Sequence, residues 1–148
     1  MPKHIKIHSS SEANSWSSRK TAIREVADSV APHRNNWISR NRFYYEDHYR
    51  FVRFLVPDDA KVLDLGCGIG DLLGALKPSV GVGIDLSKTT IEIAQRTYPE
   101  YDFYVGDIED SKVLAGVQGP FDVIILSDTI GLIEDIARTL KLLHPLCN

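Results

Sequence analysis

The chain has 148 residues, of which 43% are hydrophobic and 25% charged, values typical of a single globular domain. No apolar run approaches the ~20 residues that a membrane helix needs, and the N-terminus lacks the apolar core of a secretory signal. Two cysteines, Cys67 and Cys147, are too few for a disulfide framework and lack metal-ligand spacing. We therefore expect a cytoplasmic protein without membrane contact and without a metal site.

The net charge of −3 is divided unevenly, since residues 1–60 carry +3 and residues 61–148 carry −6. Between positions 34 and 53 the basic half interleaves five arginines with tryptophan, tyrosine and phenylalanine. Such interleaving can mark a nucleic-acid surface. We favour an amphipathic helix with a solvated charged face, because the chain is acidic overall and has no nucleic-acid motif. A nucleic-acid partner is therefore not expected.

The N-terminal part predicts a tail followed by two helices. Residues 1–18 are rich in serine and aperiodic, which predicts a mobile tail. A helix begins at Ser18 and ends at Ala31-Pro32, and a second one runs from about Asn36 to Val56. The inner stripe expected for the second helix is Trp37, Tyr44, Tyr45, His48, Phe51, Val52 and Leu55. We interpret residues 19–57 as a helical cap and His48 as a packed histidine rather than a base.

From residue 58 onward, predicted strands alternate with predicted helices. The strands are 61–65, 81–85, 101–105 and 121–127, and the helices begin near residues 71, 87, 110 and 129. The last helix, to Leu143, has an expected inner side of Leu132, Ile133, Ile136, Ala137, Leu140 and Leu143. This alternation predicts right-handed βαβ units and an open parallel α/β sheet.

The first strand runs into a glycine-rich turn, Asp64-Leu65-Gly66-Cys67-Gly68-Ile69-Gly70, that opens a helix. The spacing is GxGxG, whereas a dinucleotide fingerprint is GxGxxG. A carboxylate at Asp64 would repel a pyrophosphate and attract a cationic group. A tight turn without a ligand is the simpler alternative for this stretch alone.

This turn resembles motif I of the class I S-adenosylmethionine-dependent methyltransferases, and the resemblance extends from about Phe43 to the C-terminus. It implies a Rossmann-like sheet with strand order 3-2-1-4, residues 58–148 as the cofactor domain, and S-adenosyl-L-methionine as cofactor. The implied binding residues are Asp64, Gly66, Cys67, Gly68 and Gly70 in the turn, Asp85 for the ribose, Leu86 on the adenine, Asp107 for the adenine amino group, Ile108 in the same slot, and Ser127 near the methyl group.

Each carboxylate also has a plain structural explanation, since Asp107 could be a turn residue and Asp128 a helix N-cap. Four such positions at the ends of four successive strands are less easily explained by chance. A ribose site at Asp85 would also fit NAD, so Asp64 with GxGxG is the discriminating feature.

The mechanism implied by the resemblance is direct displacement, in which an acceptor atom takes the methyl group and S-adenosyl-L-homocysteine leaves. The protein then supplies mainly orientation. Asp128 and His48 are the candidates for a base, and we assign no catalytic residue. A small-molecule acceptor is expected. The alternatives are a non-catalytic cofactor-binding module and an NAD-dependent oxidoreductase.

The resembled family has a seven-stranded sheet, and this sequence reaches Asn148 before strand 5. Strands 5–7 are therefore absent from the expected fold, which leaves the apolar strand 121–127 at the edge. Because natural sheets avoid long apolar edges, we expect either a fragment of a longer chain or an edge covered by a second chain.

Overall fold

The structure is a computed structural model that describes residues 6–7 and 16–148. The strands are β1 (Lys6–Ile7), β2 (Lys61–Leu65), β3 (Val80–Asp85), β4 (Asp102–Val105) and β5 (Val123–Ile125). The helices are α1 (Ser18–Val30), α2 (Arg34–Arg40), α3 (Arg42–Leu55), α4 (Asp71–Leu76), α5 (Lys88–Thr97), α6 (Ser111–Ala115) and α7 (Ile136–Leu143). Short 3₁₀ turns cover Ala31–His33, Ile130–Leu132 and His144–Leu146.

The described strands form one parallel sheet in the order β1-β4-β3-β2-β5. The last four strands in this order are the predicted ones, so the expected order 3-2-1-4 is confirmed. β2 lies between β3 and β5, where Leu63 is in register with Val82 on one side and Ile124 on the other. β1 is an addition within the segment predicted as a mobile tail, 1–18. Residues 1–5 and 8–15 of that segment lie outside the described residues.

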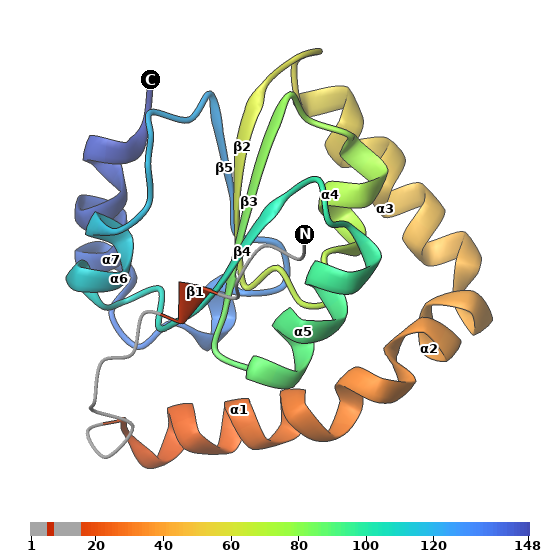
Figure 1. Cartoon of the computed structure of the whole chain (residues 1–148), viewed down its shortest axis with the longest axis horizontal. Helices are drawn as coiled ribbons and strands as arrows, with labels where there is room; N and C mark the ends of the chain where they lie inside the picture. The colour runs from red at the N-terminus through yellow and green to blue at the C-terminus, as the bar shows by residue number, and fades with distance from the viewer. Residues whose placement is uncertain (1–5, 8–15) are drawn as a thin grey trace.

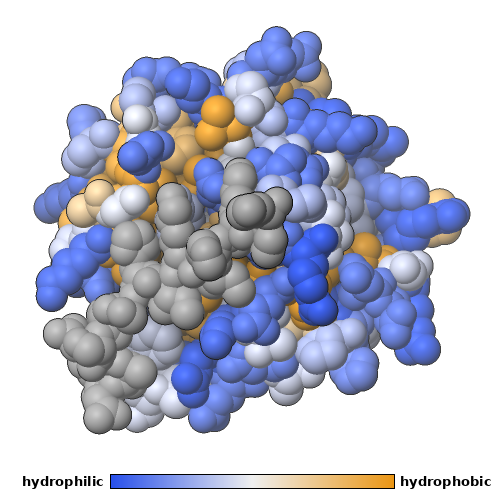
Figure 2. Space-filling view, in the orientation of Figure 1, coloured by the Kyte–Doolittle hydropathy of each residue, from blue (hydrophilic) through white to orange (hydrophobic). Residues whose placement is uncertain are grey.

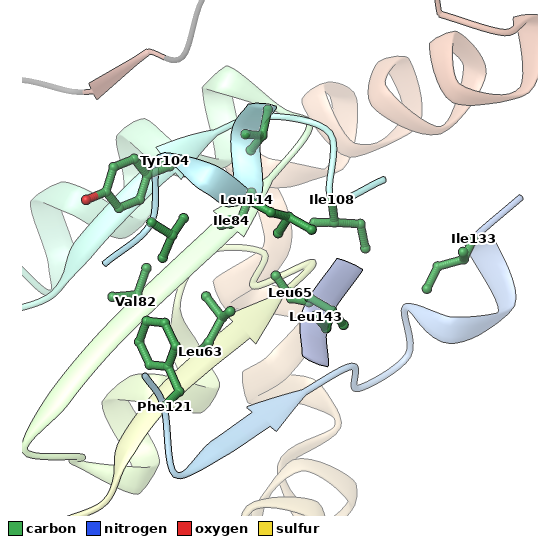
Figure 3. Packing of buried hydrophobic residues seen from close by; sticks show 12 residues of the cluster. Leu63, Leu65, Val82, Ile84, Tyr104, Ile108, Leu114, Phe121, Ile133 and Leu143 are labelled. Carbon is green, nitrogen blue, oxygen red and sulfur yellow. The ribbon is translucent and has the colours of Figure 1, made fainter. Parts of the chain in front are cut away.

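Helices cover both faces of the sheet (Figure 1). α3, α4 and α5 lie on one side, α6 and α7 lie on the other, and α1 runs across the lower end of the sheet in this view. Successive residues of β2 point to opposite faces, so Val62 packs with the α4–α5 layer and Leu63 with the α6–α7 layer. Figure 3 shows the second of these clusters, in which Leu63, Leu65 and Ile84 meet Phe121 and Leu143.

Side-chain caps explain where several helices begin. The Ser87 hydroxyl accepts a hydrogen bond from the Thr90 amide at 3.0 Å, as the sequence predicts for the start of α5. Asp110 and Asp135 cap α6 and α7 in the same way. The capping residue of α7 is thus Asp135 and not Asp128.

The predicted continuous helix from Asn36 to Val56 is wrong, because it divides at Asn41 into α2 and α3. The Asn41 side-chain amide donates to the Trp37 carbonyl at 2.9 Å, and its backbone leaves the helical region. The predicted inner stripe is also mostly wrong: Tyr45 is buried, His48 and Val52 are half-buried, and Trp37, Tyr44, Phe51 and Leu55 are exposed.

The predicted strand 121–127 and helix 129–143 are both shorter in the structure. β5 covers only three residues, and a 3₁₀ turn precedes α7. The Glu109 carboxylate accepts the amides of Glu134 and Asp135, which interrupts the helix and restarts it at Ile136. Ile133 and Leu143 are buried as predicted. The other four residues of the predicted inner side are exposed, namely Leu132, Ile136, Ala137 and Leu140. Within the described ranges, no helix combines the length and apolar character needed to cross a membrane.

Candidate functional site

A cavity of about 220 Å³ lies at the carboxyl ends of the central strands, with α1 and α3 contributing to its wall. Its lining includes Asp64, Gly66, Cys67, Gly68, Asp85, Leu86, Asp107, Ile108 and Ser127, which are all the predicted binding residues except Gly70. A Cβ on Gly70 would instead meet the Phe103 and Tyr98 rings, so Gly70 permits close packing behind the turn. The structure therefore brings residues from four successive strand ends into one site.

The glycine turn is closely packed at Gly66. Gly66 and Gly68 have φ values of 75° and 55°, a region that L side chains rarely adopt. A Cβ on Gly66 would lie 2.8 Å from Thr129 Cγ2 and closer still to Oγ1, whereas a Cβ on Gly68 would meet nothing within 4 Å. The turn thus needs Gly66 for space and conformation and Gly68 for conformation, which leaves the Gly68 surface free for a ligand.

Asp85 is held by backbone donors from two different segments of the chain. Its two carboxylate oxygens accept the Gly68 amide at 3.1 Å and the Ser87 amide at 2.9 Å. Burial raises the pKa of Asp85, and these amide hydrogen bonds only partly oppose the rise. The carboxylate is therefore fixed at the edge of the pocket between the glycine turn and the start of α5.

Asp64 is a buried acidic residue that lines the pocket beside the glycine turn. Its side chain is on the carboxyl half of β2 and the residue is only 2% exposed. Burial, reinforced by the negative charges of Asp71 and Asp85, raises the pKa of Asp64 to about 8. A cationic group above this carboxyl would favour its ionised form, so the site suits an ammonium.

The other end of the pocket contains an ion cluster that centres on Lys20. The Lys20 ammonium donates to Asp107 Oδ2 at 2.6 Å and lies 3.0 Å from Glu109 Oε2. Asp107 Oδ1 accepts the Glu109 amide at 2.9 Å, so Asp107 is also the turn residue that the simpler explanation describes. Desolvation opposes the charge on Lys20, but Asp107 and Glu109 outweigh it and raise the Lys20 pKa.

Sequence reasoning missed Lys20 and Glu109. Glu109 had a usable signal, because it follows Asp107-Ile108 directly at a strand end. Lys20 had none, because 87 positions separate it from its partner Asp107 and only the packing of α1 brings them together.

At the end of the pocket nearest β5, His48 from α3 meets Ser127. The His48 Nε2 atom lies 2.9 Å from Ser127 Oγ. Nearby on α3, the Tyr49 hydroxyl donates to the Asp71 carboxylate, and the Arg34 guanidinium lies 5.3 Å above the Tyr45 ring. His48 therefore lies in the pocket wall and not in the apolar core where sequence reasoning placed it. The described residues hold no His, Cys, Asp and Glu grouping suited to a metal ion.

The chain is similar in sequence to the members of a known protein family. The sequence profile of a family described as "Methyltransferase domain" matches residues 62–148, which is more than half of the chain. The chain belongs to this methyltransferase domain family. The matched region contains the glycine turn and the ends of all four predicted strands.

Curated relatives of this methyltransferase domain differ in what their names say they modify. The dTDP-4-amino-2,3,4,6-tetradeoxy-D-glucose N,N-dimethyltransferase of Saccharopolyspora spinosa is 35% identical over 77 residues, covering 51% of this chain and 29% of the relative. The ribosomal protein L11 methyltransferase of Thermotoga petrophila is 32% identical over 95 residues, covering 60% of this chain and 36% of the relative. The chain thus spans well under half of either relative.

Solved structures share the fold. A S-adenosylmethionine-dependent methyltransferase from Thermotoga maritima aligns with a TM-score of 0.71 at 22% identity, covering 84% of this chain and 56% of that one. The magnesium protoporphyrin IX methyltransferase from Synechocystis, solved with bound S-adenosylhomocysteine, aligns with a TM-score of 0.66 at 21% identity, covering 88% and 69%. The fold is therefore the Rossmann-like fold of S-adenosylmethionine-dependent methyltransferases.

Proposed function

We propose that this chain binds S-adenosyl-L-methionine in the pocket at the strand ends and is the cofactor-binding part of a methyltransferase. The observation that carries the proposal is the buried Asp64 carboxyl beneath a GxGxG turn, within a domain of the methyltransferase family. This arrangement provides an acidic partner for the cofactor's ammonium, where a pyrophosphate would be repelled.

We assign the remaining binding roles as the resemblance to the methyltransferases implies them, and the pocket lining supports these roles. Gly66, Cys67 and Gly68 present backbone to the cofactor, and Asp85 accepts hydrogen bonds from the ribose hydroxyls. Leu86 and Ile108 pack against the adenine, and Asp107 faces its amino group. Ser127 stands at the methyl-transfer end. These residues bind and orient the cofactor.

The proposed chemistry is direct displacement at an activated methyl group, which the cofactor supplies when it is bound. The chain's own contribution is to fix the geometry and to exclude water. The pocket's position between α1 and the strand ends serves the second purpose. Orientation of this kind can be worth about 7–11 kcal/mol in a two-reactant step.

A small-molecule acceptor is supported by the names of two similar proteins, which specify a nucleotide-linked amino sugar and a magnesium porphyrin. The second curated relative described above is named for a ribosomal protein, so a protein acceptor is the alternative. We also propose a cytoplasmic location. Both cysteines are free thiols, which is consistent with a reducing compartment.

Calorimetric titration with S-adenosyl-L-homocysteine tests the proposal, with NADH as the comparison ligand. We expect micromolar binding of S-adenosyl-L-homocysteine, about −8 kcal/mol. Asp85→Ala should abolish this binding, whereas the exposed Asp58→Ala should leave it unchanged.

Two outcomes would replace the proposal with one of its alternatives. Binding of NADH alone would favour an oxidoreductase. Binding of S-adenosyl-L-homocysteine without methyl transfer by any longer form of the protein would favour a non-catalytic module.

A further inference from the structure

His48 lies in the wall of the pocket, a location that the amphipathic pattern of α3 alone does not explain. Its Nε2 atom lies 2.9 Å from Ser127 Oγ, which bridges α3 and the segment after β5. Among the described residues, His48 is the one that lines both the central pocket and a shallow hollow over the outer face of α3. The imidazole therefore borders the pocket in which we propose that the cofactor binds.

The Ser127–His48 contact joins a hydroxyl to a group that can take up a proton. A neutral imidazole has one ring nitrogen that accepts a hydrogen bond, and a seryl hydroxyl can both donate and accept. If Ser127 donates to His48 Nε2, a lone pair of Ser127 Oγ remains free to accept a proton from a neighbouring molecule. The pair can then move one proton from the pocket to the imidazole.

The other titratable groups around this end of the pocket are less suited to this task. The Asp71 carboxylate on α4 accepts the Tyr49 hydroxyl. Asp64 on β2 lies beneath the glycine turn, and burial raises its pKa to about 8. Asp128, after β5, also lines the pocket, but it is exposed to solvent and has a left-handed backbone with a φ of 55°. The Arg34 guanidinium lies over the Tyr45 ring. Tyr44 stacks on His48 from the same helix, with ring centroids 6.3 Å apart.

We propose that Ser127 and His48 form the proton-accepting pair of the methyl transfer, and that the acceptor therefore carries a proton on its nucleophilic nitrogen or oxygen. This inference rests on the proposed function. A lone pair of the acceptor atom forms the new bond to the methyl carbon, and the carbon–sulfur bond breaks with its electron pair left on sulfur. The acceptor's proton passes to Ser127 Oγ as the seryl proton passes to His48 Nε2. The products are the methylated acceptor, S-adenosyl-L-homocysteine and an imidazolium.

The test needs no knowledge of the acceptor. Sinefungin is an analogue of S-adenosyl-L-methionine with an amine-bearing carbon in place of the methyl-bearing sulfur, so its ammonium reports on the groups that face the methyl position. The whole chain is titrated with sinefungin and with S-adenosyl-L-homocysteine from about pH 8 to about pH 5, the interval in which imidazoles titrate. Both ligands carry the same amino-acid end, so the ratio of their Kd values cancels the contribution of Asp64.

In the unaltered chain, the ratio of the sinefungin Kd to the S-adenosyl-L-homocysteine Kd should rise on the order of fivefold or more as the pH falls, because an imidazolium repels the ammonium. His48→Gln should remove this rise while S-adenosyl-L-homocysteine still binds. The matched variant His144→Gln, at an exposed histidine outside the pocket, should keep it.

A pH-independent ratio in the unaltered chain would overturn the inference, even if His48→Gln failed to fold. An equal rise in His48→Gln would overturn it as well. In either case, binding of S-adenosyl-L-homocysteine would leave the proposed function standing. If neither ligand bound the folded chain, the proposed function would fail first and this inference with it.

Discussion

Asp64 is the residue whose ionisation should be visible in the stability of the protein. Its pKa is about 8 in the folded chain and about 3.9 in an unfolded one. The folded state therefore holds a proton that the unfolded state has lost between these two pH values. Stability must fall as the pH rises across this interval, because the unfolded state binds fewer protons.

Asp64→Asn should remove this dependence. Without ligand, we expect the variant to be more stable than the unaltered chain at pH 8 and to lose less stability between pH 5 and pH 8. Urea unfolding at several pH values measures both quantities, with the exposed Asp58→Asn as the control. The same variant should bind S-adenosyl-L-homocysteine more weakly, since an amide cannot pair with the ligand's ammonium. A variant with the unaltered pH profile would refute the assignment of Asp64.

Gly66 and Gly68 differ in why the turn needs glycine: both have a left-handed backbone, but only Gly66 also lacks space for a Cβ. Alanine at either position meets the cost of a left-handed backbone, about 1–2 kcal/mol. Gly66→Ala also overlaps Thr129, which adds about 1–3 kcal/mol, whereas Gly68→Ala has open space. Denaturant unfolding should rank the variants in that order, with Gly131→Ala near zero because a Cβ there meets nothing and no positive φ is involved.

A Thr129→Ala substitution separates the steric overlap with Thr129 from the cost of the left-handed backbone. Thr129→Ala should recover part of the stability lost in Gly66→Ala and none of that lost in Gly68→Ala. If Gly66→Ala and Gly68→Ala lost the same unfolding free energy, the segment at Thr129 would have moved to make room for the new Cβ. The left-handed backbone would then be the one reason for glycine at both positions.

At the scale of the elements, α1 is held over the pocket by polar contacts near its two ends. None of its side chains is buried. Near the start of α1, Lys20 pairs with Asp107 and Glu109, and Arg19 donates to the Gly131 carbonyl at 2.9 Å. Near its end, Asp28 accepts a hydrogen bond from the Ser87 hydroxyl at 2.5 Å. A helix attached in this way should detach locally when one attachment is removed.

Lys20→Met should therefore raise the amide exchange of α1 without raising that of β2 or β3. The Lys20 side chain is 12% exposed, so the expected loss lies between that of a surface pair, below about 1 kcal/mol, and that of a buried pair, about 3–5 kcal/mol. Hydrogen exchange by mass spectrometry resolves the helix from the sheet. The exposed Lys88→Met is the matched control. Unchanged exchange in α1 would mean that its apolar contacts suffice to hold it.

The elements that sequence reasoning predicted well are those whose signal lies within the element itself. β2, β3 and β4 have apolar runs bounded by turn residues, and α5 has Ser87 at its start. The alternation of strands and helices predicted a parallel sheet, and the order of its strands was the one that the resemblance to the methyltransferases implied. The pocket residues followed because parallel strands end at one edge.

The break at Asn41 has a local cause, whereas two other failures arose where a distant partner decides the local structure. The sequence from 129 to 143 is periodic enough for one helix, yet Glu109 takes the amides of Glu134 and Asp135 and divides it. The spacing of His48 fits the inner stripe of a helix, but in the structure its side chain lies in the pocket wall in hydrogen-bond contact with Ser127. Neither partner is visible from the periodicity of the segment concerned.

At the scale of the whole molecule, the sheet ends on one side at β5. Among the described residues, β5 itself pairs only with β2, and Val123 and Ile124 are partly exposed. Just before β5, Phe121 forms a parallel bridge with Cys147, so within the described chain only the β5 portion of this edge is unpaired. The helix beside this edge is apolar on its outer surface, since Ile136 is 42% and Leu140 is 51% exposed. Figure 2 shows hydrophobic surface on the side of β5 and α7. We propose that a further segment of a longer chain, or a second chain, covers this region.

The chain studied alone should then associate with itself through this surface, because exposed apolar edges pair readily. Ile136→Lys with Leu140→Lys should shift the population toward the monomer, as measured by light scattering during size-exclusion chromatography at micromolar concentration. Both side chains are exposed on α7, so the unfolding free energy should change by only about 0.5 kcal/mol for each substitution.

The matched control is Val26→Lys with Val30→Lys on α1, where two valines are exposed to a similar degree far along the chain from β5. This pair should leave the association unchanged, because α1 borders the pocket and not the sheet edge. If the unaltered chain were monomeric, the apolar surface at β5 and α7 would be stable in contact with water. There would then be no physical reason to propose that another segment or a second chain covers it. Association abolished by the α1 pair instead would place the contact at the pocket mouth, where it would compete with the cofactor.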